Sequence, residues 1–213
     1  NPKTLLTRKN PYLFRAKNVL TAQELAETLI EAVVSSSEET IFGNRLEAIA
    51  VRVCELVYNG QKSPANGLDL DFSRDNVRYL VSIKSGKNWG NSSQHTQQNK
   101  YFQEAMKIVR QSRHQGAVQC VLGICYGKAA RKDDGIKLQL CGQDFWELIS
   151  GDAEFYKELM EPVGKVAQKH GEAYKEEKAR LINKVTKSIL DNFSVDGKLD
   201  WGKISEFNSG TSR

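Results

Sequence analysis

The feature that most constrains this sequence is the segment 68–84, in which apolar and polar residues alternate on both sides of a short polar turn. Alternation with period two is typical of β-strands, because successive side chains point to opposite faces of a sheet. If Asp75 and Asn76 form a two-residue turn, Arg74 pairs with Val77, and the register of the whole hairpin follows. A slip by one residue would bury the charged side chains, so we expect this register.

The register sorts the side chains of the hairpin into two groups. One face is apolar and carries Leu68, Leu70, Phe72, Tyr79, Val81 and Ile83. The other face gathers Asp69, Asp71, Ser82 and Lys84, with Asp69 directly opposite Ser82. Carboxylate oxygens are hard ligands that suit Mg²⁺, and a nearby ammonium group can orient water or stabilise developing charge. The pattern fits metal-assisted phosphodiester hydrolysis, but an exposed sheet face with an ordinary Asp–Lys pair stays open as an alternative.

The rest of the chain alternates between helical and strand patterns, without internal repeats. Thr21 and Glu24 form a capping-box pattern that predicts the start of the first helix. We expect helices over 22–35, 44–58 and 93–115, strands over 117–127 and 136–142, and helical sequence from 143 to about 193. The serine-rich segment 35–40 is expected to separate the first two helices. This order predicts an α/β fold, with a central mixed β-sheet flanked by helices and a helical C-terminal region.

Charge and composition narrow the possible functions. Between Val81 and Lys132 the chain has nine Lys or Arg residues and one acidic residue, Glu104. Such a block is the pattern of a surface for a polyanion, although a solvated basic helix face would look the same. The stretch also holds many amide and hydroxyl side chains, which can contact phosphates or base edges.

The cysteines and the hydropathy favour a cytoplasmic protein. The four cysteines lie in apolar stretches without a CxxC spacing, so we expect reduced core residues. Three histidines make a zinc site improbable. No apolar run approaches the roughly 18–20 residues that span a bilayer, so no membrane partner is expected.

The hairpin belongs to a wider set of motifs. The block GLDLDFSRDNVRYLVSIKSG resembles the active-site hairpin of the PD-(D/E)xK nuclease superfamily, in which a hydrophobic–Asp step precedes a strand that ends in (D/E)-x-K. The stretch GKNW…QQNKYF, the strand ending in ICYG, the GQDFW helix start and NPYLF look like one subgroup of type II restriction endonucleases. The resemblance covers roughly residues 10–208 and implies a restriction-endonuclease-like fold.

Carried over by position, the resemblance implies a set of catalytic residues. Asp69 matches the metal-binding aspartate and Lys84 the catalytic lysine, while Ser82 occupies the (D/E) position. The missing carboxylate leaves the other ligands open: the backbone carbonyl of Ile83, water, and either Asp71 or Glu47. Glu47 lies where many members of the superfamily have an additional acid, although a solvated helix glutamate is an equal alternative.

The resemblance further implies a site-specific deoxyribonuclease that depends on Mg²⁺ and cuts double-stranded DNA as a homodimer. The candidates to hold DNA are Lys87, Trp89, Asn91, Gln97, Asn99 and Lys100, of which Trp89 fits a loop anchor equally well. We expect residues 1–150 to form the catalytic core with its N-terminal helices, and residues 151–213 to form a helical region with the dimer contact. Two alternatives stay open: a nuclease of DNA repair or junction resolution, and a DNA-binding module that has lost catalysis.

Overall fold

The structure is a computed structural model that describes residues 2–112 and 116–211, and for 162–172 the backbone only. The contacts divide the chain into two compact units. We call residues 40–163 the sheet unit, and residues 1–39 together with 164–213 the helical unit.

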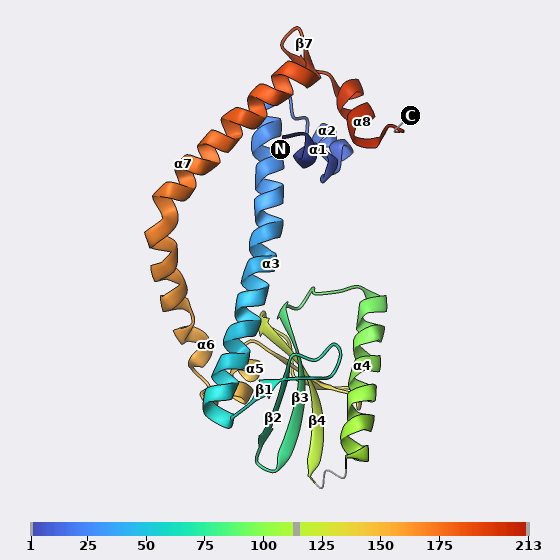
Figure 1. The fold of residues 1–213 in the computed structure, drawn as a ribbon, viewed down its shortest axis with the longest axis vertical. Helices are drawn as coiled ribbons and strands as arrows, with labels where there is room; N and C mark the ends of the chain where they lie inside the picture. Colours follow the sequence, from blue (N-terminus) through green and yellow to red (C-terminus); the bar gives the residue numbers. More distant parts are fainter. Residues whose placement is uncertain (1, 113–115, 212–213) are drawn as a thin grey trace. The chain divides into compact units, whose positions relative to one another are not determined.

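The sheet unit is built on a six-stranded mixed sheet with the strand order β1-β2-β3-β4-β6-β5. The β2–β3 pair is antiparallel, whereas β4 runs parallel to both β3 and β6. Its strands are β1 (Gln61–Lys62), β2 (Leu70–Arg74), β3 (Val77–Gly86), β4 (Ala117–Tyr126), β5 (Lys132–Asp133) and β6 (Leu138–Cys141). Its helices are the C-terminal part of α3 (Ala22–Tyr58), then α4 (Ser92–Gln111), α5 (Gln143–Ser150), α6 (Phe155–Glu158) and the first residues of α7 (Met160–Phe193). The predicted α/β fold with a mixed sheet and flanking helices is therefore confirmed (Figure 1).

The predicted hairpin register is also confirmed. Arg74 pairs with Val77 and Leu70 with Val81 across β2 and β3. Asp75 and Asn76 have φ of 50° and 61°, the left-handed values that a type I′ turn requires at both of its central residues. This turn matches the right-handed twist of the two strands, which fixes their pairing.

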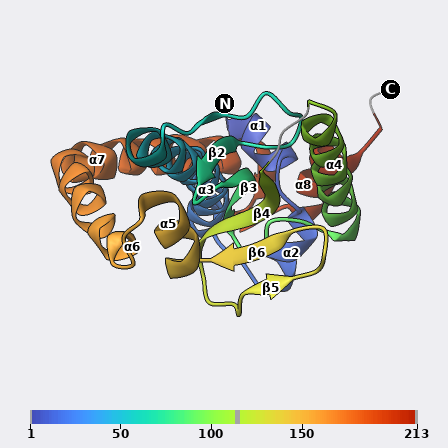
Figure 2. The ribbon, with the colours of Figure 1, turned by 90° about the horizontal axis from the view of Figure 1, so that it is seen from below.

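Helices cover both faces of the sheet, so the polar face of the hairpin is not an exposed sheet face. On one face, α3 and α5 pack against Leu70, Phe72, Val81 and Ile83. On the other face, Phe102 of α4 packs in one cluster with strand residues including Leu80, Leu122 and Ile124. The alternation had suggested that Leu68 lies on the same face as Leu70 and Phe72. It belongs instead to the second cluster, on the opposite face. Figure 2 shows α5 and α4 on opposite sides of the sheet.

The serine-rich segment does not interrupt the N-terminal helices. α3 is one helix of 37 residues and includes both segments that the sequence had suggested were separate. Ser36 and Ser37 donate hydrogen bonds from their hydroxyl groups to the carbonyls of Ala32 and Val33, both at 2.9 Å. The hydroxyls are thereby satisfied within the helix, so they do not compete with its backbone bonds.

The helical unit has its own core. It contains α1 (Pro2–Thr7), α2 (Pro11–Ala16), the first part of α3, most of α7, the hairpin β7 (Ser194–Val195) and β8 (Lys198–Leu199), and α8 (Trp201–Ser209). Leu25 and Leu29 of α3 are fully buried in one cluster with Val185 and Ile189 of α7. The capping box before α3 forms as predicted, since Thr21 and Glu24 each accept a hydrogen bond from the other's backbone N–H at 3.1 Å.

The two compact units differ from the expected division at residue 150. The N-terminal helices share a unit with the C-terminal helices, because α3 and α7 bury their apolar faces in one core. A functional division into 1–150 and 151–213 stays a prediction. Within the described part of the chain, no helix combines the length and apolar character needed to cross a membrane.

All four cysteines are buried and free, as expected. Burial raises the pKa of the Cys54, Cys120 and Cys125 thiols to about 12, because a thiolate is poorly solvated in the core. We predict that iodoacetamide at pH 8 leaves the native protein unmodified over minutes, whereas in denaturant all four cysteines react, as mass spectrometry would show. Fast labelling of the native protein would contradict this packing.

Candidate active site

Asp69 immediately precedes β2 and lies beside the middle of β3. The backbone N–H of Asp69 donates to the carbonyl of Val81 at 2.8 Å, which extends the pairing of the two strands by one residue. The Oδ2 atom of Asp69 accepts a hydrogen bond from the backbone N–H of Ile83 at 2.6 Å. The Ser82 hydroxyl lies 3.3 Å from the same oxygen. The carboxylate is therefore oriented by the neighbouring strand.

Lys84 lies on the same face of the sheet as Ser82 and Asp69. Ser82 and Lys84 are two residues apart in β3, so their side chains point to the same side. Lys84 is partly buried, and its Nζ atom lies 5.3 Å from the centre of the Trp89 ring, a cation–π arrangement. The ring of Trp89 packs on His95 of α4 with 4.2 Å between centroids. The loop after β3 is thus anchored to α4, and the tryptophan ring limits the positions open to the lysine.

Glu47 of α3 interacts electrostatically with this pair of residues. Burial raises the pKa of Glu47 above its ordinary value, and the negative charge of Asp69 raises it further. The positive charges of Lys62 and Lys84 act in the opposite direction. Glu47 and Asp69 are therefore close enough to repel each other, and Lys84 is close enough to attract Glu47.

These residues fit a hard divalent cation. Two carboxylates that repel each other, the Ser82 hydroxyl and nearby backbone carbonyls are oxygen donors of the kind that Mg²⁺ prefers. Among the described residues, no group of three or more His, Cys, Asp or Glu side chains forms a metal cluster. A cation here would therefore take Asp69 and Glu47 as its charged ligands and complete its shell with neutral oxygens and water.

Asp71 is held in an ion pair. It is buried, and both of its oxygens accept hydrogen bonds from Arg78, at 2.9 and 2.7 Å. Such a two-fold contact satisfies a carboxylate in the protein interior. The suggested role of Asp71 as a metal ligand stays a prediction, and it would require this pair to open.

Gln98 of α4 contacts the site, whereas its neighbour Gln97, one of the candidate DNA-binding residues, does not face Ser82. Gln98 is buried and lies beside Ser82, while Gln97 is exposed. The apolar spacing of the helix contains the signal, because Gln98 precedes Phe102 by four residues and shares its face. Successive helix residues point about 100° apart, so adjacent glutamines have different surroundings.

The other candidate DNA-binding residues surround the start of α4. Asn91 is the N-cap of α4, and its side-chain oxygen accepts a hydrogen bond from the backbone N–H of Gln94 at 3.1 Å. Asn99 accepts one from Lys137 at 2.7 Å. Lys87 and Lys100 are exposed, as a role in binding phosphates requires. Contact of these residues with DNA stays a prediction.

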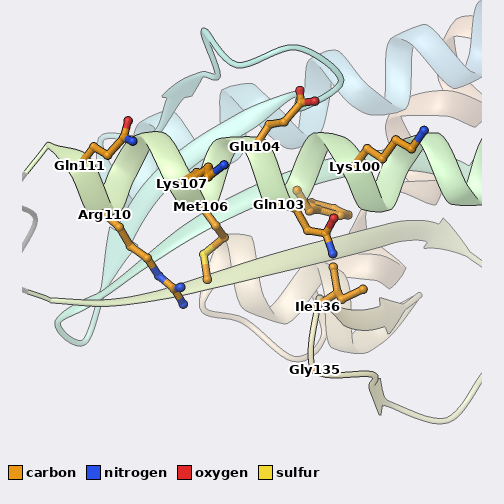
Figure 3. A pocket seen from close by; sticks show the side chains of 10 residues that line it. Lys100, Gln103, Glu104, Met106, Lys107, Arg110, Gln111, Gly135 and Ile136 are labelled. Carbon is orange, nitrogen blue, oxygen red and sulfur yellow. The ribbon is translucent and has the colours of Figure 1, made fainter.

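A basic groove follows α4 away from the site. It has a volume of about 670 Å³ and lies between α4 and the loop that contains Gly135 and Ile136. Lys100, Lys107 and Arg110 contribute positive charge to its lining. Figure 3 shows Arg110 pointing from the helix toward the side of that loop. The block of basic residues seen in the sequence thus contributes several cations to one side of the sheet unit.

The fold and the site together define a class of protein. A mixed sheet flanked by helices, with an acid and a lysine on one face of an antiparallel hairpin, is the arrangement of a restriction-endonuclease-like nuclease. The family model for type II restriction endonuclease EcoO109I matches residues 1–171, more than half of the chain. The chain belongs to this family, and its function is that of a restriction enzyme that cleaves DNA. No curated protein matches the sequence.

The Asp71–Arg78 pair gives a test of stability that is separate from catalysis. We predict that Arg78→Met lowers the free energy of unfolding by about 3 kcal/mol, because it leaves a buried carboxylate without a partner. Urea unfolding followed by circular dichroism measures this change. Arg52→Met is the matched control, since Arg52 forms an exposed pair with Glu55 and its loss should change stability by less than about 1 kcal/mol. Equal urea midpoints for Arg78→Met and wild type would contradict a structural role of this pair.

Proposed function

We propose that the protein cleaves double-stranded DNA at a specific sequence by Mg²⁺-dependent hydrolysis of phosphodiester bonds. The observation that carries this proposal is the convergence of Asp69, Ser82 and Lys84 on one face of the hairpin, with Glu47 close enough to respond to two of them. Membership in a family of type II restriction endonucleases supports the same reaction. DNA in the cytoplasm would be the substrate.

The side chains have separate roles in this proposal. Asp69, with Glu47, the Ile83 carbonyl and Ser82 as further oxygen donors, holds the divalent cation. When bound, the cation neutralises charge on the scissile phosphate and lowers the pKa of a water molecule. Lys84 orients the attacking water and stabilises the negative charge that develops on the phosphate oxygens. The water oxygen loses a proton to solvent and forms a bond to phosphorus. The bond to the 3′ oxygen breaks, this oxygen takes up a proton from solvent, and the phosphate stays on the 5′ end.

The exposed cations would hold the DNA. Lys87 and Lys100 are exposed and would bind phosphates, and the groove along α4 would extend this contact through Lys107 and Arg110. The amide side chains of Asn91, Gln97 and Asn99 would approach base edges. The carbonyl ends of Asn91 and Asn99 are already hydrogen-bonded within the protein, so their amino groups would be the donors.

The catalytic roles predict a loss of cleavage without a loss of binding. Lys84→Ala and Asp69→Asn should each lower the cleavage rate in Mg²⁺ by at least about 100-fold, because each removes a group needed in the transition state. Digestion of plasmid DNA of varied sequence, followed by electrophoresis, measures the cleavage rate. Sequencing the ends of the fragments identifies the recognition site and the 5′-phosphate. Fluorescence anisotropy without divalent ions measures the affinity for DNA.

The matched control is Lys157→Ala, an exposed lysine of α6 paired with Glu154, which should cut like wild type. Discrete fragments from wild type identify a restriction enzyme, whereas cleavage confined to branched DNA would identify a junction-specific nuclease. If the wild-type protein binds DNA but cuts no substrate in Mg²⁺ or Mn²⁺, the result would favour a DNA-binding module that has lost catalysis. Such a loss would be consistent with Ser82 in the place of an acid.

We also propose a homodimer, because two equivalent active sites related by two-fold symmetry would cut both strands of a palindrome. Tyr174 and Leu181 of α7 are exposed and lie about two turns apart, on the same face of the helix. Exposed apolar side chains on one face of a helix favour a contact between copies of the chain.

The dimer contact predicts that Leu181→Glu shifts the protein from dimer to monomer in analytical ultracentrifugation, because the contact would bury an unpaired charge. Leu190→Glu is the matched control, since Leu190 is also exposed but lies about half a turn around α7 from Leu181. A monomeric wild type, or a Leu181→Glu variant that stays dimeric, would contradict this contact.

A further inference from the structure

Gln98 joins two parts of the active site through the two ends of its side-chain amide. Its Nε2 atom donates a hydrogen bond to the backbone carbonyl of Gly67 at 2.9 Å. Its Oε1 atom lies 3.2 Å from the hydroxyl oxygen of Ser82. A backbone carbonyl can only accept, so the amino end of the amide must face Gly67. Ser82 therefore always faces an acceptor oxygen.

The Gly67 carbonyl is itself fixed by α4. Gly67 has φ of +71°, and a Cβ atom at this residue would lie 2.1 Å from the ring of Tyr101. Only glycine fits a left-handed backbone in such close contact with a ring. Tyr101 follows Gln98 by three residues in α4, so one helix sets both the carbonyl and the amide that binds it.

The Ser82 hydroxyl consequently lies between two acceptors. The Asp69 carboxylate is 3.3 Å away and the Gln98 carbonyl 3.2 Å away. A hydroxyl has one hydrogen and can donate to only one of these acceptors at a time. Ser82 is fully buried, so bulk water does not offer a third partner.

We propose that Gln98 is a positioning residue that accepts the Ser82 hydrogen when Asp69 binds a divalent cation. This inference rests on the proposed metal-dependent nuclease. Without a cation, the negative charge of Asp69 attracts the hydroxyl hydrogen. A positive charge at Asp69 repels that hydrogen, and rotation about the Cβ–Oγ bond directs it to Gln98 without breaking any covalent bond. The serine oxygen then turns its lone pairs toward the cation.

This arrangement gives a physical reason why serine can occupy a position where an acid is expected. A neutral hydroxyl is a useful oxygen donor only if its hydrogen points away from the cation. In this chain the acceptor that makes this possible comes from α4, and not from the hairpin. The hydrogen-bonded pair of Ser82 and Gln98 would thus perform part of the work of the missing carboxylate.

Binding of Mn²⁺ to the DNA-free protein, followed by electron paramagnetic resonance, tests this role without relying on cleavage. Gln98→Leu and Ser82→Ala should each weaken Mn²⁺ binding by about 5-fold, the factor expected for one hydrogen bond. The double variant should bind no more weakly than Ser82→Ala alone, because Gln98 acts only through Ser82. Gln103→Leu, an exposed glutamine of the same helix, should bind Mn²⁺ like wild type.

Thermal unfolding of each variant separates this role from a general effect on packing. If Gln98→Leu does not fold, Gln98→Met is used in its place in the same comparison, because methionine retains the length of the glutamine side chain. Unchanged Mn²⁺ affinity in a folded Gln98 variant overturns the positioning role and leaves the nuclease proposal intact. A double variant whose loss of Mn²⁺ affinity equals the product of the two single losses also overturns this role, because Gln98 would then act independently of Ser82. Absence of Mn²⁺ binding by the wild type would overturn the proposed metal site itself.

Discussion

The antiparallel pairing of β2 with β3 is the constraint on which the candidate active site depends. The type I′ turn sets the register, and the backbone N–H of Ile83 then holds the Asp69 carboxylate at 2.6 Å. Because the same strand also carries Ser82 and Lys84, one set of backbone hydrogen bonds positions an acid, a hydroxyl and an amine together. The precision of the site thus comes from the sheet, which is more rigid than a loop.

Coverage of both sheet faces determines the chemistry of that hairpin. With α4 packed over the polar side, Ser82 and Asp71 are buried, and each needs a defined partner. Arg78 satisfies Asp71 through two hydrogen bonds, and Gln98 lies within hydrogen-bonding distance of Ser82. Glu47 of α3 is itself partly buried, which raises its pKa, and the charges of Asp69, Lys62 and Lys84 on neighbouring elements also act on it.

The helical unit brings the N-terminal and C-terminal helices of the chain together in one core. α3 and α7 each begin in one unit and end in the other, and within the helical unit their apolar faces share a core with α1, α2 and α8. Once this core has formed, exposed apolar side chains such as Tyr174 and Leu181 remain on α7. Packing within the unit therefore accounts for one face of α7 and leaves another face for the proposed partner copy.

The sequence alone determined the strand register, the sharing of one face by Asp69, Ser82 and Lys84, and the class of fold, because alternation and turn chemistry are local. It did not determine what covers that face, so the burial of Asp71 was missed. Nor did it distinguish Gln98 from Gln97. The pairing of Asp71 with Arg78 does follow from the predicted register, which places Asp71 opposite Leu80 and therefore on the same face as Arg78. The burial of Asp71 and the choice between the two glutamines depend on how helices pack on the sheet, and helix packing joins residues distant in sequence through contacts that no local pattern contains.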